Sequence, residues 1–318
     1  MLRLALVCPV YNDWTSFEIL LGNLNQLFDG SENQVHIYAI DDGSLMRPNL
    51  NALPELSNLA KVEIISLVGN VGHQRAIMIG LCDISERDDF DVVVVLDCDG
   101  EDQPVDILKL IQSHDANPSS IVVAQRAARS EGVIFKFFYS IYKRLFKFMT
   151  GQAIDFGNFC LIPKNMLARL VHLPESWNHL AAAIVRSGMP IVRVPTQRGR
   201  RYAGSSNMNF MSLAIHGLGA ISVFIETLLM RIFLIVLLAI GIYAICIIAF
   251  AVYYYFVSPF PILGWLKTAI LISGLILIQL ALFAMVAVFV VLSGRTTQKL
   301  PPSLFSKNYV NQIIQVKS

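Results

Sequence analysis

Hydrophobic residues in the first two thirds of the chain form short continuous runs, separated by segments with helical spacing. Five β-branched or aliphatic runs suit buried parallel strands: Leu4–Cys8, Val35–Ile40, Val62–Leu67, Val92–Leu96 and Ile121–Ala124. Apolar residues recur at helical intervals between them, at Phe17, Leu20, Leu21 and Leu24 and again at Ile107, Leu108 and Ile111. This order predicts an α/β fold with a doubly wound, mostly parallel sheet that binds ligands at the carboxyl ends of its strands.

The last third of the chain contains two long stretches without charge. Ile232–Val257 has 26 residues and Thr268–Gly294 has 27, none of them charged. About 20 apolar residues suffice to cross a bilayer. The link Ser258–Trp265 contains two prolines and a glycine, which break helices. We therefore predict two transmembrane helices, joined as a hairpin whose ends lie on one side of the membrane.

The cations that flank these stretches predict their orientation. Arg231 precedes the first stretch, whereas Arg295 and Lys299 follow the second. Cytoplasmic flanks carry an excess of Lys and Arg, so both ends of the hairpin are expected in the cytoplasm. Lys267, in the short outer loop, counts against this assignment.

Composition narrows the class of protein further. The 318 residues are 55% apolar and 15% charged, which excludes a disordered chain. A net charge of +2 gives no reason to expect a nucleic-acid partner. The five cysteines show no metal-binding spacing and are expected to be free thiols in a reducing compartment. The first apolar run is broken by Pro9, unlike a signal peptide, so residues 1–207 are expected in the cytosol.

Polar residues cluster directly after four of the predicted strands. The clusters are Pro9–Asp13, Asp41–Ser44, Gly69–His73 and Asp97–Asp102. Strand ends are where ligands bind in this class of fold. No GxGxxG follows a strand and no GxxxxGK[ST] is present, so neither a Rossmann dinucleotide site nor a P-loop is expected.

The cluster Asp97–Asp102 is the most informative, because it holds four carboxylates in six residues. Carboxylate oxygens suit Mg²⁺ or Mn²⁺, which commonly bridge protein to phosphate. Gly100 permits a turn that would let Asp97 and Asp99 converge. Taken alone, the cluster also fits a solvated acidic loop before a helix that begins near Pro104, and Asp41–Ser44 alone also fits an ordinary turn.

Together, these segments resemble the inverting GT-A glycosyltransferases of family 2, and within it the polyprenyl-phosphate glycosyltransferases (the dolichyl-phosphate-mannose synthase-like group). The resemblance covers about residues 4 to 210, and the two-helix tail is similar to bacterial members, which implies a location in a bacterial inner membrane. The segments that carry it are Val7–Asp13, Ile40–Ser44, Asn70–Leu81, Asp97-x-Asp99, Gln125-Arg126, Asp155-x-Gly157-x-Phe159 and Arg201–Ser206.

The resemblance implies a role for individual residues. Those implied to bind the nucleotide-sugar donor are Pro9, Tyr11, Asp13, Asp42, Asp97, Cys98 and Arg126. Those implied to hold Mg²⁺ or Mn²⁺ are Asp99, Asp97 and Glu101. Those implied to act at the reacting centre are Asp155, Asp97 and Arg126, while Arg201 and Ser206 would belong to a loop at the phosphates.

The implied activity is metal-dependent transfer of a sugar, with inversion, from a nucleotide-diphosphate sugar to a membrane polyprenyl phosphate such as undecaprenyl or dolichyl phosphate. A divalent metal and arginines would stabilise the leaving diphosphate. A lipid phosphate is already anionic near pH 7, so Asp155 would orient the acceptor or steady the sugar's positive charge rather than act as a strong base. The family also suggests homo-oligomers.

Three positions depart from the group's pattern. Gly100-Glu101 stands where these proteins have Leu-Gln, so Glu101 would bring a charge in place of a neutral ligand. Gly204–Asn207 lacks the lysine of the usual Gly-Glu-Ser-Lys, and Cys160 replaces an arginine. The sequence therefore does not assign which residues contact the donor phosphates.

The domain organisation follows from these patterns. We predict a GT-A domain over residues 1–207, which includes an aromatic and basic interfacial helix near 134–150. A juxtamembrane helix over 208–230, the hairpin over 231–294 and a cytosolic tail over 295–318 complete the chain.

Two alternatives remain at this point. Gln197–Arg201 approaches the QxxRW of processive polysaccharide synthases but lacks the tryptophan, and two spans are few for a polymer channel. A membrane scaffold or transporter subunit is the other alternative. Neither span holds the ionisable residues that transport pathways use, which disfavours it.

Overall fold

The chain folds into two compact units. The computed structural model describes residues 1–46, 48, 55–126, 144, 146–204, 210–257, 264–294 and 300–317. The unit that we call the sheet unit comprises Met1–Phe137, Ala153–Val223 and Leu300–Ser318. The other, the helical unit, comprises Phe138–Gln152 and Phe224–Lys299.

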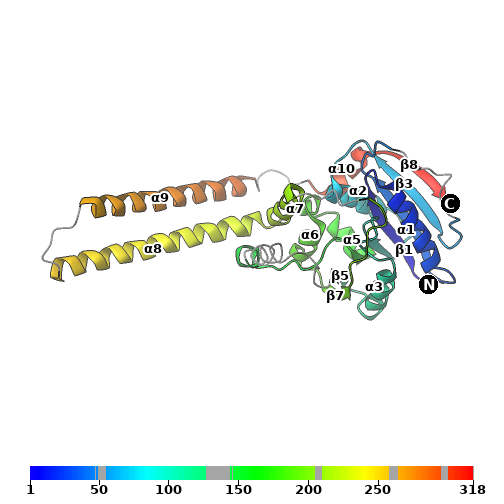
Figure 1. Ribbon diagram of the computed structural model, residues 1–318, viewed down its shortest axis with the longest axis horizontal. Coiled ribbons are helices and arrows are strands. Elements are labelled where there is room, and N and C mark those ends of the chain that lie inside the picture. Colours follow the sequence, from blue (N-terminus) through cyan, green and yellow to red (C-terminus); the bar gives the residue numbers. More distant parts are fainter. Residues whose placement is uncertain are drawn as a thin grey trace. The chain divides into compact units, whose positions relative to one another are not determined.

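An eight-stranded mixed sheet forms the centre of the sheet unit (Figure 1). Its strands are β1 (Arg3–Val10), β2 (Gln34–Asp41), β3 (Lys61–Leu67), β4 (Val92–Val95), β5 (Ile121–Arg126), β6 (Cys160–Pro163), β7 (Ile191–Thr196) and β8 (Val310–Lys317). Their order in the sheet is β7-β5-β6-β4-β1-β2-β3-β8. Neighbouring strands among β4, β1, β2 and β3 are parallel, as are β5 and β7. The predicted α/β fold and the five predicted strands are confirmed.

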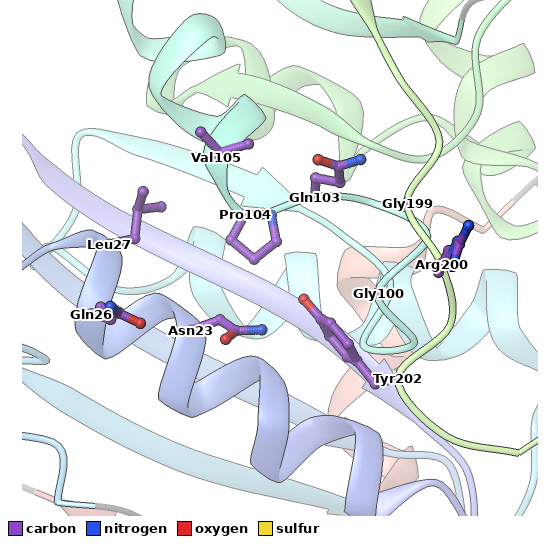
Figure 2. Close-up of a pocket in the computed structure, with 10 residues that line it drawn as sticks. All are labelled: Asn23, Gln26, Leu27, Gly100, Gln103, Pro104, Val105, Gly199, Arg200 and Tyr202. Carbon is purple, nitrogen blue, oxygen red and sulfur yellow. The ribbon is translucent and has the colours of Figure 1, made fainter.

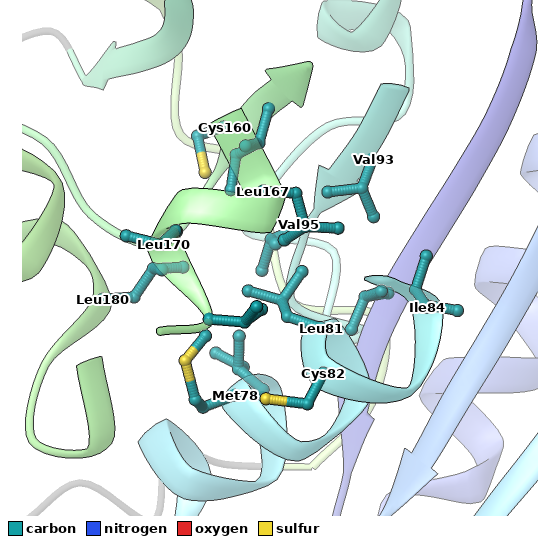
Figure 3. Close-up of a cluster of buried hydrophobic side chains, with 14 of the residues drawn as sticks. Met78, Leu81, Cys82, Ile84, Val93, Val95, Cys160, Leu167, Leu170 and Leu180 are labelled. Carbon is teal, nitrogen blue, oxygen red and sulfur yellow. The ribbon is translucent and has the colours of Figure 1, made fainter. Parts of the chain in front are cut away.

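Helices cover both faces of this sheet. α1 (Trp14–Leu27) and α3 (Val105–Ala116) pack on one face, and α2 (His73–Ser85), α5 (Lys164–Leu170) and α6 (Leu180–Arg186) pack on the other. Alternate residues of β1 serve the two faces, since Leu4 and Leu6 contact the α1 side while Ala5 and Val7 contact the α2 side. Figure 3 shows the core on the α2 side, where Leu81 of α2 and Leu167 of α5 lie beside Val95 of β4.

Two antiparallel strands were not apparent from the sequence. β6 lies between β4 and β5 and is antiparallel to both. β8 lies at the edge of the sheet, antiparallel to β3, and pairs Ile314 with Ile64 and Ile313 with Ile65. The C-terminal segment therefore completes the sheet. The other helices of this unit are η2 (Pro174–Trp177), α7 (Phe210–Ser222), α10 (Pro302–Phe305) and η3 (Ser306–Tyr309).

The helical unit contains two long apolar helices, α8 (Ile225–Val257) and α9 (Gly264–Ser293). Both are long and apolar enough to cross a membrane, and an 18-residue window of each has a mean hydropathy of 3.1 and 3.0, respectively. The hydroxyl of Tyr243 in α8 lies 2.7 Å from that of Ser273 in α9 and links the two. Of the interfacial helix predicted near 134–150, residues 134–143 and 145 lie outside the described residues, while 144 and 146–150 are helical.

Candidate active site

The candidate site is built from loops that follow the parallel strands of the sheet unit. The loop after β1 and the loop after β2 are tied together, since the Asn12 N–H donates to Ser44 Oγ at 2.9 Å and the Leu45 N–H donates to Asn12 Oδ1 at 2.9 Å. Asn12 has a positive φ of 52°, a conformation that Asn tolerates better than most residues. These bonds fix the segment that carries Tyr11 and Asp13.

Asp42 holds the loop after β2 against the turn that begins α2. Its carboxylate accepts hydrogen bonds from the Val71 N–H at 2.7 Å and the Gly72 N–H at 3.1 Å. The side chain is buried, and burial raises the pKa of the Asp42 carboxyl above its ordinary value although the two N–H groups lower it. In this structure the predicted donor ligand Asp42 therefore supports the turn between β3 and α2.

The acidic cluster after β4 forms a compact loop held by its own carboxylates. The Asp97 N–H donates to Asp102 Oδ2 at 3.2 Å, and the Glu101 N–H donates to Asp99 Oδ1 at 2.9 Å. Gly100 has a φ of +88°, a conformation that L side chains rarely adopt. The turn that the sequence suggested at Gly100 is present.

A basic segment after β7 docks on this acidic loop. The Gly199 N–H donates to the Glu101 carbonyl at 2.9 Å, and the Tyr202 N–H donates to the Asp99 carbonyl at 2.8 Å. The approach is so close that a Cβ at Gly199 would lie 2.2 Å from the Gly100 carbonyl oxygen. Glycine at this position lets the two backbones meet.

Arginines of the basic segment pair with the carboxylates of the loop. Arg201 Nη1 lies 3.0 Å from Asp99 Oδ2, and Arg201 Nη2 lies 3.3 Å from Asp13 Oδ2. Arg198 pairs with Glu101. Burial raises the pKa of the Asp99 carboxyl, and the charges of Asp97 and Glu101 raise it further. A cation beside Asp99 therefore stabilises this loop.

Asp97 contacts a different group, His73 at the start of α2. His73 Nε2 lies 3.3 Å from Asp97 Oδ1 and 3.1 Å from Asn158 Nδ2. Although burial lowers the pKa of His73, the combined attraction of Asp97, Asp42 and Asp99 outweighs it and raises the pKa. Asn158 also accepts a hydrogen bond from Gln74 Nε2 at 3.1 Å. His73 thus connects the acidic loop with the segment that contains Asp155.

Asp155 is held by β5 and β7. Its Oδ2 accepts a hydrogen bond from Gln125 Nε2 at 2.7 Å, and both of its oxygens lie 3.1 Å from Arg193 Nε. Arg193 was not singled out in the sequence, because a lone arginine in a strand carries no motif. The backbone of Arg126 ends β5, whereas its side chain and Ser206 lie outside the described residues.

The remaining predicted donor residues differ in exposure. Tyr11 is exposed, while Pro9 is buried in β1 opposite Ile40. The Cys98 side chain packs in the core on the α1 side, and burial raises the pKa of its thiol well above the ordinary value. The Cys98 side chain is therefore part of the core packing.

A pocket of about 450 Å³ opens beside the same acidic loop (Figure 2). It is lined by Asn23, Gln26 and Leu27 of α1, by Gly100 and Gln103–Val105, and by Gly199, Arg200 and Tyr202. Among the side chains that the structure describes, none of those predicted to bind donor or metal lines it. The structure thus separates Arg200, which faces this pocket, from Arg201, which faces the carboxylates.

Solved structures share this fold. Glucosyl-3-phosphoglycerate synthase from Mycobacterium tuberculosis, in complex with Mn²⁺, UDP-glucose and phosphoglyceric acid, matches with a TM-score of 0.51 at 13% identity. The match covers 71% of this chain and 80% of that one. The sheet unit therefore has the GT-A fold of a class of glycosyltransferases.

The sequence assigns the family. Residues 5–176 match the glycosyl transferase family 2 domain, so the chain belongs to this family. It is 26% identical over 208 residues to the uncharacterized glycosyltransferase YkcC of Bacillus subtilis, covering 64% of this chain and 63% of that protein. It is 24% identical over 217 residues to the undecaprenyl-phosphate 4-deoxy-4-formamido-L-arabinose transferase of Klebsiella pneumoniae, covering 66% and 64%. The chain thus spans less than two thirds of the length of both relatives.

Proposed function

We propose that this protein transfers a sugar, with inversion, from a nucleotide-diphosphate sugar to a membrane polyprenyl phosphate at the cytosolic membrane face. The observation that carries the proposal is the contact at the acidic loop after β4, where Arg201 pairs with both Asp99 and Asp13 at the carboxyl ends of parallel strands in a family 2 domain. The Klebsiella pneumoniae relative, named as an undecaprenyl-phosphate transferase, supports a lipid phosphate as acceptor.

The donor set of the acidic loop fits Mg²⁺ or Mn²⁺. Asp97 and Asp99 offer hard carboxylate oxygens two residues apart, and such ions are commonly bound through one or two carboxylates together with substrate phosphates and water. The described residues contain no preformed group of three acidic, histidine or cysteine side chains for a metal, so Asp97, Asp99 and Glu101 are not assembled as one ligand set in this structure. A bound ion would supply positive charge to the departing diphosphate.

Other residues of this chain would stabilise the diphosphate and orient the reacting groups. Arg201 already bridges Asp13 and Asp99, and its guanidinium is placed to share charge with a donor diphosphate. His73 orients Asp97 by direct contact. Asp155, fixed by Gln125 and Arg193, would orient the acceptor phosphate or the sugar, and Glu101 would reach a metal only by releasing Arg198.

The arrangement of the chain supports a membrane acceptor. α8 and α9 are candidate membrane spans, and the chain belongs to the sheet unit both before α8 and again from Leu300. Because β8 pairs with β3 in the same sheet, two spans would leave both ends of the helix pair on the side where the sheet unit lies. The flanking Arg231, Arg295 and Lys299 favour the cytoplasmic side.

Membranes that contain the protein should move label from a nucleotide sugar into an organic-soluble lipid phosphate. The test uses radiolabelled UDP-glucose, UDP-N-acetylglucosamine, UDP-galactose and GDP-mannose, each with undecaprenyl phosphate. Chelation should abolish the product and Mg²⁺ or Mn²⁺ should restore it. Label in a polymer would instead indicate a processive synthase, and no transfer from any donor would contradict the proposal.

Asp99→Asn should lower this transfer by at least about a hundredfold, because it removes the charge that the metal requires at the diphosphate. Asp88→Asn is the matched control, since Asp88 is exposed and its carboxylate pairs with Lys164 away from the loop. Transfer by Asp88→Asn should stay within twofold of the unmodified protein. Undiminished transfer by Asp99→Asn would remove Asp99 from the metal site.

A further inference from the structure

The helical unit contains a second cavity, separate from the candidate active site. It measures about 610 Å³ and is lined by Arg144, Lys147, Phe148, Arg231, Leu234 and Ile235. All six residues belong to the helical unit, and none of the residues predicted to bind donor or metal is among them. The residues that line this cavity therefore differ from those of the candidate active site.

Three cations line one part of this cavity. Within the described part of the chain, no carboxylate pairs with Arg144, Lys147 or Arg231. Three positive charges that line one cavity repel one another, so an anion between them would be stabilised.

Arg231 is held in place by the end of the short helix at 146–150. Its guanidinium donates to the Phe148 carbonyl and lies against Gly151, where a Cβ would be 2.6 Å from Arg231 Nη2. Carbonyls at a helix C-terminus lack helical partners and attract cations. Because arginine has five N–H donors, this contact leaves others for an anion.

The rest of the cavity is apolar and exposed. The side chains of Phe148, Leu234 and Ile235 are 63%, 55% and 43% exposed. Leu234 and Ile235 belong to the uncharged stretch of α8 that begins directly after Arg231. The cations thus lie where a candidate membrane span begins, next to a surface suited to hydrocarbon.

We propose that this cavity binds the headgroup of an anionic phospholipid of the surrounding bilayer, with its phosphate between Arg144, Lys147 and Arg231 and an acyl chain along Leu234 and Ile235. The combination of cations and adjoining apolar surface selects this occupant. A soluble phosphate would leave the apolar surface uncovered, and a neutral lipid would leave the cations unpaired. Basic pockets beside transmembrane helices on the cytoplasmic side bind such headgroups elsewhere.

The full-length protein, delipidated in detergent, should bind fluorescent phosphatidylglycerol more tightly than fluorescent phosphatidylcholine. Lys147→Gln should weaken phosphatidylglycerol binding about fivefold, and Arg144→Gln with Lys147→Gln about thirtyfold, since each cation near an anionic lipid contributes similarly. Arg231 is left intact because it also supports the helix end at Phe148. Native mass spectrometry should show the same order of retained phosphatidylglycerol.

Lys267→Gln is the matched control, because Lys267 is an exposed cation of the same unit near the start of α9 and outside the cavity. It should leave phosphatidylglycerol binding unchanged. Equal loss in Lys147→Gln and Lys267→Gln would show unspecific attraction and overturn the proposal. Displacement of phosphatidylglycerol by inorganic phosphate alone would do the same, and displacement by a substoichiometric amount of undecaprenyl phosphate would assign the cavity to the acceptor. None of these readouts depends on sugar transfer, so failure of the proposed function leaves the test intact.

Discussion

At the scale of single residues, one guanidinium joins two loops that are far apart in sequence. Arg201 contacts Asp13 after β1 and Asp99 after β4. Its neighbour Arg200 lines a different pocket and forms no ion pair with any residue that the structure describes. Two adjacent arginines of equal charge therefore provide a matched pair for testing position rather than charge.

Arg201→Ala should reduce kcat/KM for sugar transfer roughly a hundredfold, because a positioned cation at developing negative charge is lost. Arg200→Ala should change it by less than about twofold. Steady-state kinetics with a labelled donor would compare the two. Equal losses in both variants would mean that the overall charge of the segment, rather than the contact with Asp13 and Asp99, matters.

The ion pair between Arg3 and Asp91 gives a pH-dependent contribution to stability. Hydrogen bonds from Arg3 hold the pKa of the Asp91 carboxyl below its ordinary value. The ionised form therefore stabilises the fold above about pH 4, and this contribution is lost as the pH falls through the folded-state pKa. Asp91→Asn should lower the free energy of unfolding at pH 7 by about 0.5–1 kcal/mol, a small effect because the pair is partly exposed.

Thermal unfolding in detergent at a series of pH values would measure this contribution. The difference in Tm between Asp91→Asn and the unmodified protein should shrink as the pH falls below about 4. Asp115→Asn, which removes an exposed carboxylate at the end of α3, should leave Tm unchanged at pH 7. A difference for Asp91→Asn that grew at low pH would have the wrong sign for this pair.

At the scale of elements, the loops at the strand ends depend on close backbone contact. Gly43 has a φ of +72°, and a Cβ there would lie 2.5 Å from the carbonyl carbon of Gly69. This approach brings Asp42 within reach of the Val71 and Gly72 N–H groups. The backbone conformation of Gly43 therefore affects the position of Asp42 in the candidate site.

Gly43→Ala should destabilise the sheet unit by about 1–3 kcal/mol, because alanine strains the positive φ and displaces the turn at Gly69. Gly69→Ala should have little effect, since a Cβ at Gly69 meets no atom within 4 Å. Denaturant unfolding would compare the free energies of unfolding of the two variants, which change the two glycines of this contact. Similar stability for both would show that the turn relaxes without cost.

At the scale of the whole molecule, the chain leaves the sheet unit for the helical unit and then returns. β8, which follows both long helices in sequence, forms the edge of the sheet beside β3. The residues before α8 and the residues from Leu300 onward thus belong to one folded unit. If both helices span a membrane, the two chain ends must lie on the same side.

Tags at the N-terminus and the C-terminus should both be cleaved by protease in inverted membrane vesicles and both be protected in right-side-out vesicles. A tag inserted between α8 and α9 should show the opposite accessibility. Cleavage of the two terminal tags in different vesicle preparations would contradict the membrane topology. It would also contradict pairing of β8 with β3 in the mature protein.

Strands β1 to β5, the two apolar helices and the family could be predicted from the order of the amino acids alone. These features are local, because hydrophobic periodicity and short motifs depend on residues that are close together in the chain. Strand order and side-chain partners depend on long-range packing. The positions of β6 and β8, the pairing of Arg193 with Asp155 and the core location of Cys98 were therefore visible only in the folded chain.

The acidic loop depends both on its local sequence and on long-range packing. Its composition predicted a need for positive charge, because four carboxylates in six residues repel one another. Which groups meet that need was decided by tertiary structure, since Arg198, Arg201 and His73 reach the loop from about 25 to 100 residues away. Sequence fixes the charge of such a loop, and only the packing of distant segments decides what lies against it.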